Sequence, residues 1–148
     1  DWTYLGDTMT GWARLDNVRD LLKDVFENNI AGDYIETGVW RGGNSMFARA
    51  VMRSYGEASK RKSYVCDSFQ GLPPNSRALD QGDLGWDSTP YLEVNEEIVQ
   101  DGFEKYSLLD SNVVFAKGFF NETMKPLSTM IHTLAVMRLD GDMYESTV

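Results

Sequence analysis

The stretch that decides the fold is residues 33–45, which read DYIETGVWRGGNS. A short apolar run around Ile35 has strand character and passes directly into a turn that contains three glycines. Glycine has no Cβ, so the backbone of such a turn can bend tightly and approach a ligand closely. A helix is predicted to begin near Ser45, and its N-terminus directs free amide groups and a positive dipole at the same space. The stretch therefore predicts a strand, a ligand-binding turn and a helix.

Outward from this stretch, predicted helices alternate with short apolar strands. This alternation predicts one domain with a Rossmann-like α/β fold, in which helices cover both faces of a parallel sheet. Ligands of such sheets bind beyond the carboxyl ends of the strands, where the strand order reverses. We expect residues 71–90 to form a long functional or mobile loop. The expected helices are 15–26, 45–55, one around 94–103, and 121–130, and the expected strands are 34–37, 64–66, 113–115 and 134–139.

Composition excludes several classes of function. The 148 residues carry 14 Lys and Arg against 23 Asp and Glu, a net charge of −9, which argues against nucleic-acid and anionic-membrane partners. Cys66 is the single cysteine and His132 the single histidine, so internal disulfides and Cys- or His-rich metal sites are excluded. No apolar run approaches the roughly 20 residues of a membrane helix, and no signal segment opens the chain, so we expect a cytoplasmic protein.

Two acids end the first two predicted strands. Glu36 would repel a pyrophosphate and favour an ammonium group, whereas Asp67 offers the carboxylate that a ribose diol needs. A surface acid and a turn aspartate are the respective structural alternatives. The glycine spacing differs from the dinucleotide pattern G-x-G-x-x-G. The combination favours S-adenosylmethionine over NAD, while an NAD-linked oxidoreductase and a non-catalytic binding domain stay as alternatives. Ser45 is expected either to cap its helix or to bind an anion.

The last predicted strand is followed by a cluster of three acids. Residues 138–147 read RLDGDMYEST and place Asp140, Asp142 and Glu145 within six positions. Carboxylate oxygens suit Mg²⁺ or Ca²⁺, and a bound metal could acidify a substrate hydroxyl while a neighbouring carboxylate accepts its proton. An exposed acidic turn that caps a helix is the structural alternative.

Three motifs together resemble one family. Residues 33–45, residues 67–73 (DSFQGLP) and residues 138–147, preceded by an approach that contains Thr8–Met9, resemble the macrocin O-methyltransferase (TylF-type) family over nearly the whole chain. The resemblance implies a class I methyltransferase that depends on S-adenosylmethionine and Mg²⁺. It further implies a small hydroxylated acceptor, most naturally a sugar of an antibiotic glycoside, with a catechol-like acceptor as the alternative. A homodimer is the expectation for the oligomeric state.

The resemblance also implies residue roles. Around the cofactor it places Glu36, Gly38, Gly42 and Ser45 at the methionine end, Asp67 at the ribose, Ser68 and Phe69 beside the nucleoside, Gly118 and Phe119 near the adenine, and Thr8 and Met9 over the whole. The implied catalytic residues are Asp140, as the Mg²⁺ ligand, and Asp142, as the general base. The family's last strands and its paired aspartates, which complete the metal site, do not fall within these 148 residues. We therefore expect a sheet truncated after the fourth strand and no methyl transfer by this chain alone.

Overall fold

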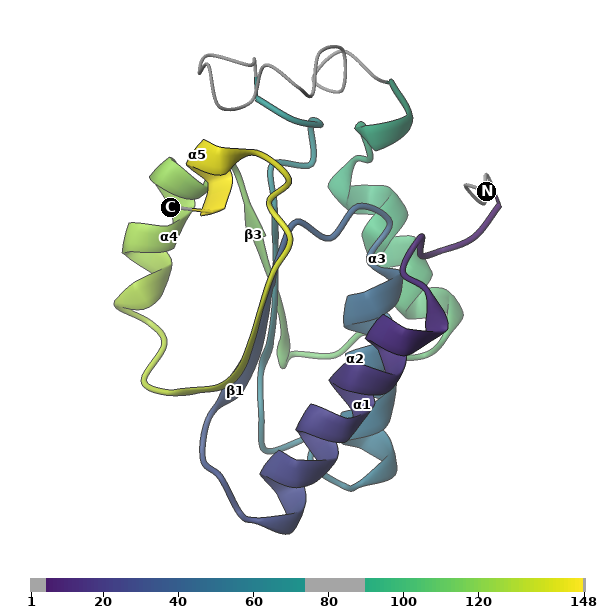
Figure 1. The fold of residues 1–148 in the computed structure, drawn as a ribbon, viewed down its shortest axis with the longest axis vertical. Coiled ribbons are helices and arrows are strands. Elements are labelled where there is room, and N and C mark those ends of the chain that lie inside the picture. The colour runs from purple at the N-terminus through teal and green to yellow at the C-terminus, as the bar shows by residue number, and fades with distance from the viewer. Residues whose placement is uncertain (1–4, 74–89, 148) are drawn as a thin grey trace.

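Four parallel strands form the sheet, in the order β3-β2-β1-β4 (Figure 1). The computed structural model describes residues 5–73 and 90–147. The parallel α/β fold predicted from the sequence is confirmed, and each predicted strand lies within two residues of an observed one. The strands are β1 (Asp33–Thr37), β2 (Ser63–Asp67), β3 (Val113–Lys117) and β4 (Leu134–Leu139). Their carboxyl ends lie at the top in Figure 1.

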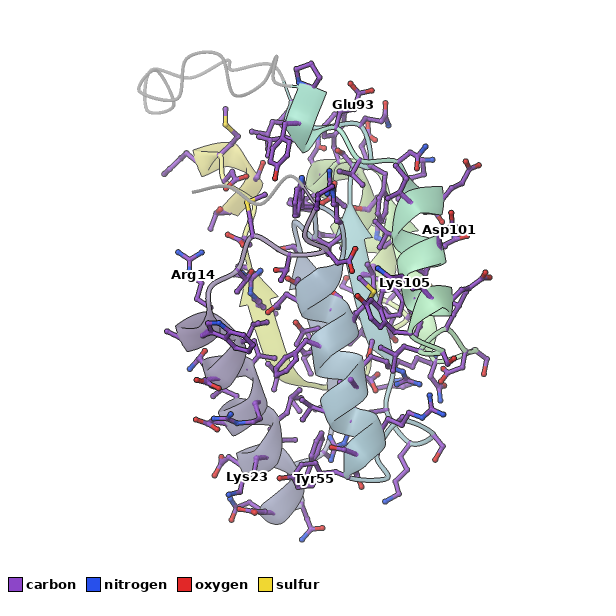
Figure 2. The ribbon with its side chains drawn as sticks, turned by 90° about the vertical axis from the view of Figure 1, so that its right-hand side faces the viewer. Arg14, Lys23, Tyr55, Glu93, Asp101 and Lys105 are labelled. Atoms are coloured by element: carbon purple, nitrogen blue, oxygen red, sulfur yellow. The ribbon has the colours of Figure 1, made fainter. Side chains whose placement is uncertain are left out.

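Helices cover both faces of this sheet. Figure 2 looks onto the face covered by three helices that lie side by side: α1 (Trp12–Glu27), α2 (Gly43–Ser54) and α3 (Glu96–Lys105). The opposite face carries α4 (Phe120–Ser128). Two short elements lie beyond the carboxyl ends of the strands, the 3-10 helix η2 (Pro90–Leu92) and α5 (Tyr144–Thr147).

The apolar spacing of α1 explains its position. Val18, Leu22 and Val25 recur at intervals of four and three residues, so they share one face of the helix, and all three are buried. They pack with Ala48 and Met52 of α2 in one hydrophobic cluster. The same cluster contains Tyr34 of β1 and Val136 of β4, so α1 and α2 pack against the sheet.

Capping chemistry determines where α3 begins. The side-chain oxygen of Asn95 accepts a hydrogen bond from the backbone N–H of Ile98 at 3.0 Å, which makes Asn95 the N-cap. Glu96 and Glu97 occupy the first turn and Lys105 the last, as the helix dipole favours.

The described residues cover only part of the predicted loop 71–90, because residues 74–89 lie outside them. In the described part of the chain, no helix has both the length and the apolar character that a membrane span requires.

Candidate functional site

A cavity of about 400 Å³ lies at the carboxyl ends of β1, β2 and β4. This is the position at which parallel sheets of this kind bind their ligands. Of the predicted site residues, the structure brings nine together on this cavity: Thr8, Met9, Glu36, Gly38, Asp67, Ser68, Phe119, Asp140 and Asp142. Four others, Gly42, Ser45, Phe69 and Gly118, are not among its lining residues.

Gly42 and Ser45 belong to the turn and to α2 but do not line the cavity. Gly42 has a φ of 76°, and a Cβ on it would lie 2.5 Å from the Cγ1 of Val99, so this glycine allows the turn to pack against α3. Ser45 is fully buried, and its hydroxyl donates a hydrogen bond to Glu36 Oε2. The hydroxyl therefore supports a neighbouring acid and does not cap α2, whose N-cap is Gly42.

Phe69 and Gly118 do not line the cavity but stabilise the chain around it, through core packing and a backbone hydrogen bond. The Phe69 ring is buried in the core, with its centroid 6.2 Å from that of Phe115. The backbone N–H of Gly118 donates to the carbonyl of Asp67 at 3.0 Å, so this glycine joins the ends of β3 and β2. Their direct contact with a cofactor stays a prediction.

Gly38 joins the ends of three strands. Its N–H donates to the carbonyl of Cys66 at 2.9 Å, and its φ is 82°. A Cβ on Gly38 would lie 1.9 Å from the carbonyl oxygen of Asp140, a distance that no side chain can accept. The absence of a side chain thus allows the backbone after β1 to lie against the backbone after β4.

Glu36 is almost completely buried, with 1% of its surface exposed. Its Oε1 accepts hydrogen bonds from Asn44 Nδ2 at 3.1 Å and Arg138 Nη1 at 2.7 Å, and its Oε2 accepts from the hydroxyls of Tyr34, at 3.0 Å, and Ser45. Burial raises the pKa of the Glu36 carboxyl, against the opposing effects of the Arg138 charge and of the three neutral donors. A carboxylate offers about four acceptor positions, and all of these are taken by the protein itself.

Arg138 was assigned no role from the sequence. It lies beside Glu36 in the register of β1 and β4, and its Nη2 donates to Asp140 Oδ2 at 2.7 Å. Partial burial lowers the pKa of the guanidinium, but the charges of Glu36 and Asp140 outweigh it and raise that pKa. Arg138 therefore links two acids at the cavity as a permanent cation. A charged residue within an otherwise apolar strand was the signal that could have identified it.

Asp67 is held mainly by backbone groups. Its Oδ2 accepts from the N–H of Val39 at 2.7 Å and of Trp40 at 3.3 Å. Its Oδ1 accepts from the N–H of Phe69 at 2.9 Å, with the Ser68 hydroxyl farther away at 3.4 Å. This carboxylate thus fixes the glycine turn while it faces the same cavity as Glu36.

The N-terminal segment lies over the start of α2. Asp7 anchors it, because its carbonyl accepts from the N–H of Gly43 at 2.9 Å and its carboxylate accepts from the Tyr106 hydroxyl at 2.6 Å. Lys105, labelled in Figure 2, forms an ion pair with the same carboxylate at 3.1 Å. The Tyr106 hydrogen bond is the largest influence and holds the pKa of Asp7 below its usual value. This anchor places Thr8 and Met9 on the cavity.

The acidic cluster after β4 does not complete a metal site. Asp140 is paired with Arg138, and Asp142 adopts a left-handed backbone with a φ of 58°. Within residues 5–73 and 90–147, no group of three or more His, Cys, Asp or Glu side chains is arranged to hold a metal ion. Of the metal ligands that the resemblance implies, the described residues place Asp140 on the cavity, which is one ligand and not a complete site, so Mg²⁺ binding stays a prediction.

Comparison with known proteins points to one group of enzymes. The chain is 43% identical to the 8-demethyl-8-(2,3-dimethoxy-alpha-L-rhamnosyl)-tetracenomycin-C 4'-O-methyltransferase of Streptomyces olivaceus. The match covers 99% of the chain and 56% of that enzyme. It is 41% identical to the demethyldecarbamoylnovobiocin O-methyltransferase of Streptomyces niveus, again over 99% of the chain and 56% of the relative. The solved structure of the O-methyltransferase NovP superposes with a TM-score of 0.90 at 42% identity, covering 99% of this chain and 60% of that one.

These similarities extend along the whole sequence, although the chain spans little more than half the length of the curated relatives it matches. The family model described as macrocin-O-methyltransferase (TylF) matches residues 1–148. The motifs, the parallel sheet and the cavity at its carboxyl edge all agree with that match. The chain belongs to the macrocin O-methyltransferase (TylF) family.

Proposed function

We propose that this chain forms the cofactor-binding part of an S-adenosylmethionine-dependent O-methyltransferase that acts on a hydroxyl of a glycosylated small molecule. The observation that carries the proposal is that Glu36 and Asp67, at the ends of neighbouring strands, line one cavity. Its volume of about 400 Å³ falls in the range of ligand pockets. An elongated molecule with an amino-acid end and a ribose end fits a cavity that has Glu36 and its neighbours on one side and Asp67 on the other.

Asp67 retains a position for a ribose hydroxyl. The Ser68 hydroxyl has one proton, and it lies 2.6 Å from the carbonyl oxygen of Gly71, against 3.4 Å from Asp67 Oδ1. The hydroxyl therefore donates its proton to the Gly71 carbonyl and not to Asp67, which leaves one acceptor position of Asp67 Oδ1 open. We assign the ribose to this position and the nucleoside to the side of the cavity formed by Ser68 and Phe119.

The amino-acid end of the cofactor would lie on the Glu36 side, beneath Thr8 and Met9. Gly38 belongs to this side as well, because its bare backbone leaves the wall of the cavity open. Gly42 and Ser45 act there indirectly, by packing the turn against α3 and by donating to Glu36.

The cofactor supplies a methyl group activated by its sulfonium charge, so the protein has to orient the acceptor and remove its proton. Asp142 lines the cavity and is the base we assign to the acceptor hydroxyl. Arg138 holds the neighbouring Asp140 in place through its 2.7 Å ion pair. A bound Mg²⁺ would take Asp140 as one ligand and would supply acidification of the acceptor hydroxyl, and no step of this proposal is routed through that ion.

The acceptor is inferred from the relatives. One matching enzyme is named for the 4'-O-methylation of a rhamnosyl-tetracenomycin, and another, 36% identical over the whole chain, for the 3''-O-methylation of mycinamicin III. We therefore favour a sugar hydroxyl over a catechol-like one. A negative net charge of −9 supports a small-molecule partner and not a nucleic acid. The predicted homodimer and the cytoplasmic location stay proposals.

Calorimetric titration of the chain with S-adenosylhomocysteine, and separately with NAD, tests the cofactor assignment. We expect saturable binding of the first and none of the second. Binding of NAD alone, or of neither molecule, would overturn the assignment. Asp142→Asn in a full-length version of the enzyme should lower turnover with little change in cofactor affinity, and unchanged turnover would remove Asp142 from its role.

A further inference from the structure

Asn44, in the first turn of α2, carries an unusual side chain. It is 3% exposed and lines the cavity beside Glu36. Its amide nitrogen donates to Glu36 Oε1 at 3.1 Å and to the Tyr34 hydroxyl at 3.3 Å. Its amide oxygen is buried and has no hydrogen-bond partner among the described residues. Buried polar atoms of this kind are rare, because a missing hydrogen bond costs folding free energy.

The surroundings fix which way the amide is turned. The Tyr34 hydroxyl uses its proton on Glu36 Oε2 at 3.0 Å, so towards Asn44 it can only accept. The near oxygen of Glu36 also accepts, since it lies 2.7 Å from the Arg138 guanidinium. Both neighbours need a donor, so the Asn44 nitrogen must face them. The oxygen is therefore the atom left for a ligand.

Glu36 itself is a poor direct ligand for an ammonium group. Its two oxygens already accept four hydrogen bonds, and only 1% of its surface is exposed. An ammonium group could reach it only by displacing one of these donors. Asn44 lines the same side of the cavity, and its amide oxygen has a vacant acceptor position.

We propose that the side-chain oxygen of Asn44 accepts a hydrogen bond from the amino group of an adenosyl cofactor's amino-acid end, and that Glu36 is a positioning residue that orients this amide. The inference rests on the proposed function, because it assigns one contact within the same cofactor site. It changes the role predicted for Glu36 from direct ligand to support of the ligand.

The test compares three ligands that differ at one end. S-adenosylhomocysteine carries the amino group, its deamino analogue has a hydrogen there, and methylthioadenosine lacks the amino-acid end. In Asn44→Ala we expect S-adenosylhomocysteine to bind roughly ten- to a hundredfold more weakly, as for a hydrogen bond to a charged group, and methylthioadenosine to bind as before. In the unsubstituted chain the deamino analogue should lose a similar factor. In Asn44→Ala, removal of the amino group should cause no further loss.

Asn28→Ala is the matched control, because it removes the same side-chain amide from an exposed position just after α1, away from the cavity. We expect it to leave the affinity ratio of S-adenosylhomocysteine to methylthioadenosine unchanged. Additive losses from Asn44→Ala and from deamination would overturn the proposal, as would an equal loss for all three ligands. Should Asn44→Ala not fold, the unsubstituted chain still decides, because equal binding of S-adenosylhomocysteine and its deamino analogue excludes the contact. Failure of the unsubstituted chain to bind any of the three would overturn the proposed function instead.

Discussion

The two ends of the cavity hold their acids in different ways. Glu36 is surrounded by side-chain donors and is 1% exposed, and every acceptor position of its carboxylate is filled. Asp67 is held by three backbone N–H groups and keeps one position on Oδ1. Backbone donors fix an acid without enclosing it, whereas four side chains enclose it completely.

The difference separates two roles that look identical in the sequence. An acid at the end of a parallel strand can bind a ligand directly, as we propose for Asp67. It can also hold other side chains in place, as Glu36 holds Asn44 and Arg138. Each role predicts its own response to substitution.

The largest effect on stability is expected at Gly38, where the backbone after β1 lies against the backbone after β4. Gly38→Ala would place a Cβ 1.9 Å from the Asp140 carbonyl oxygen, at a φ of 82°. We expect the free energy of unfolding to fall by at least about 4 kcal/mol, measured by urea denaturation. Gly56→Ala is the control, because its φ of 71° is similar but nothing lies within 4 Å of the added Cβ. Its loss should stay near the roughly 1–2 kcal/mol of left-handed backbone strain, and equal losses in the two variants would contradict the steric argument.

Arg138→Leu tests the enclosed end. The substitution leaves Glu36 buried without its cation, so we expect a loss of about 3 kcal/mol in the free energy of unfolding. Arg19→Leu is the matched control, since Arg19 forms ion pairs with Asp16 and Asp20 on the exposed surface of α1. Exposed pairs contribute little, so this control should change stability far less than Arg138→Leu does. A loss no larger in Arg138→Leu than in the control would show that Glu36 does not depend on its cation.

Asp67→Ala tests the open end through ligand affinity. We expect S-adenosylhomocysteine and methylthioadenosine to lose affinity by the same factor, roughly thirtyfold or about 2 kcal/mol, because both carry the ribose. Asp101→Ala removes a similar charge from the exposed surface of α3 and should leave both affinities unchanged. A loss confined to S-adenosylhomocysteine would move Asp67 to the amino-acid end and reverse our orientation of the ligand.

The strands and the location of the site could be predicted from the sequence. Short apolar runs that each end in a polar residue specify a parallel sheet with its ligand edge, and Glu36 and Asp67 were placed there correctly. The apolar sequence of β4 does not by itself show how far its side chains are exposed. Met137 and Leu139 are 57% and 53% exposed, because β4 is the outer strand of the described sheet.

The direction of individual side chains could not be predicted in the same way. Spacing in the sequence brings Gly42 and Ser45 to the turn, but it does not say that one faces α3 and the other faces Glu36. Arg138 and Glu36 are 102 positions apart, and only the register of β1 and β4 brings them together. The vacant oxygen of Asn44 depends on the full set of its neighbours, which no local pattern encodes.

The smallest effect concerns the ionisation of the enclosed acid. Burial raises the pKa of Glu36 in the folded chain above its value in the unfolded chain. In the interval between these two values the folded state binds more protons, so stability falls as the pH rises. Glu36→Gln removes this titration. We therefore expect the difference in unfolding free energy, unsubstituted chain minus variant, to decrease as the pH rises above about 4.3, the usual pKa of a glutamate. Urea denaturation at a series of pH values between 4 and 7 measures this difference. No decrease over this interval would mean that Arg138 and the three neutral donors offset burial, and that the enclosed carboxylate is held in its charged form at least as firmly as an exposed one.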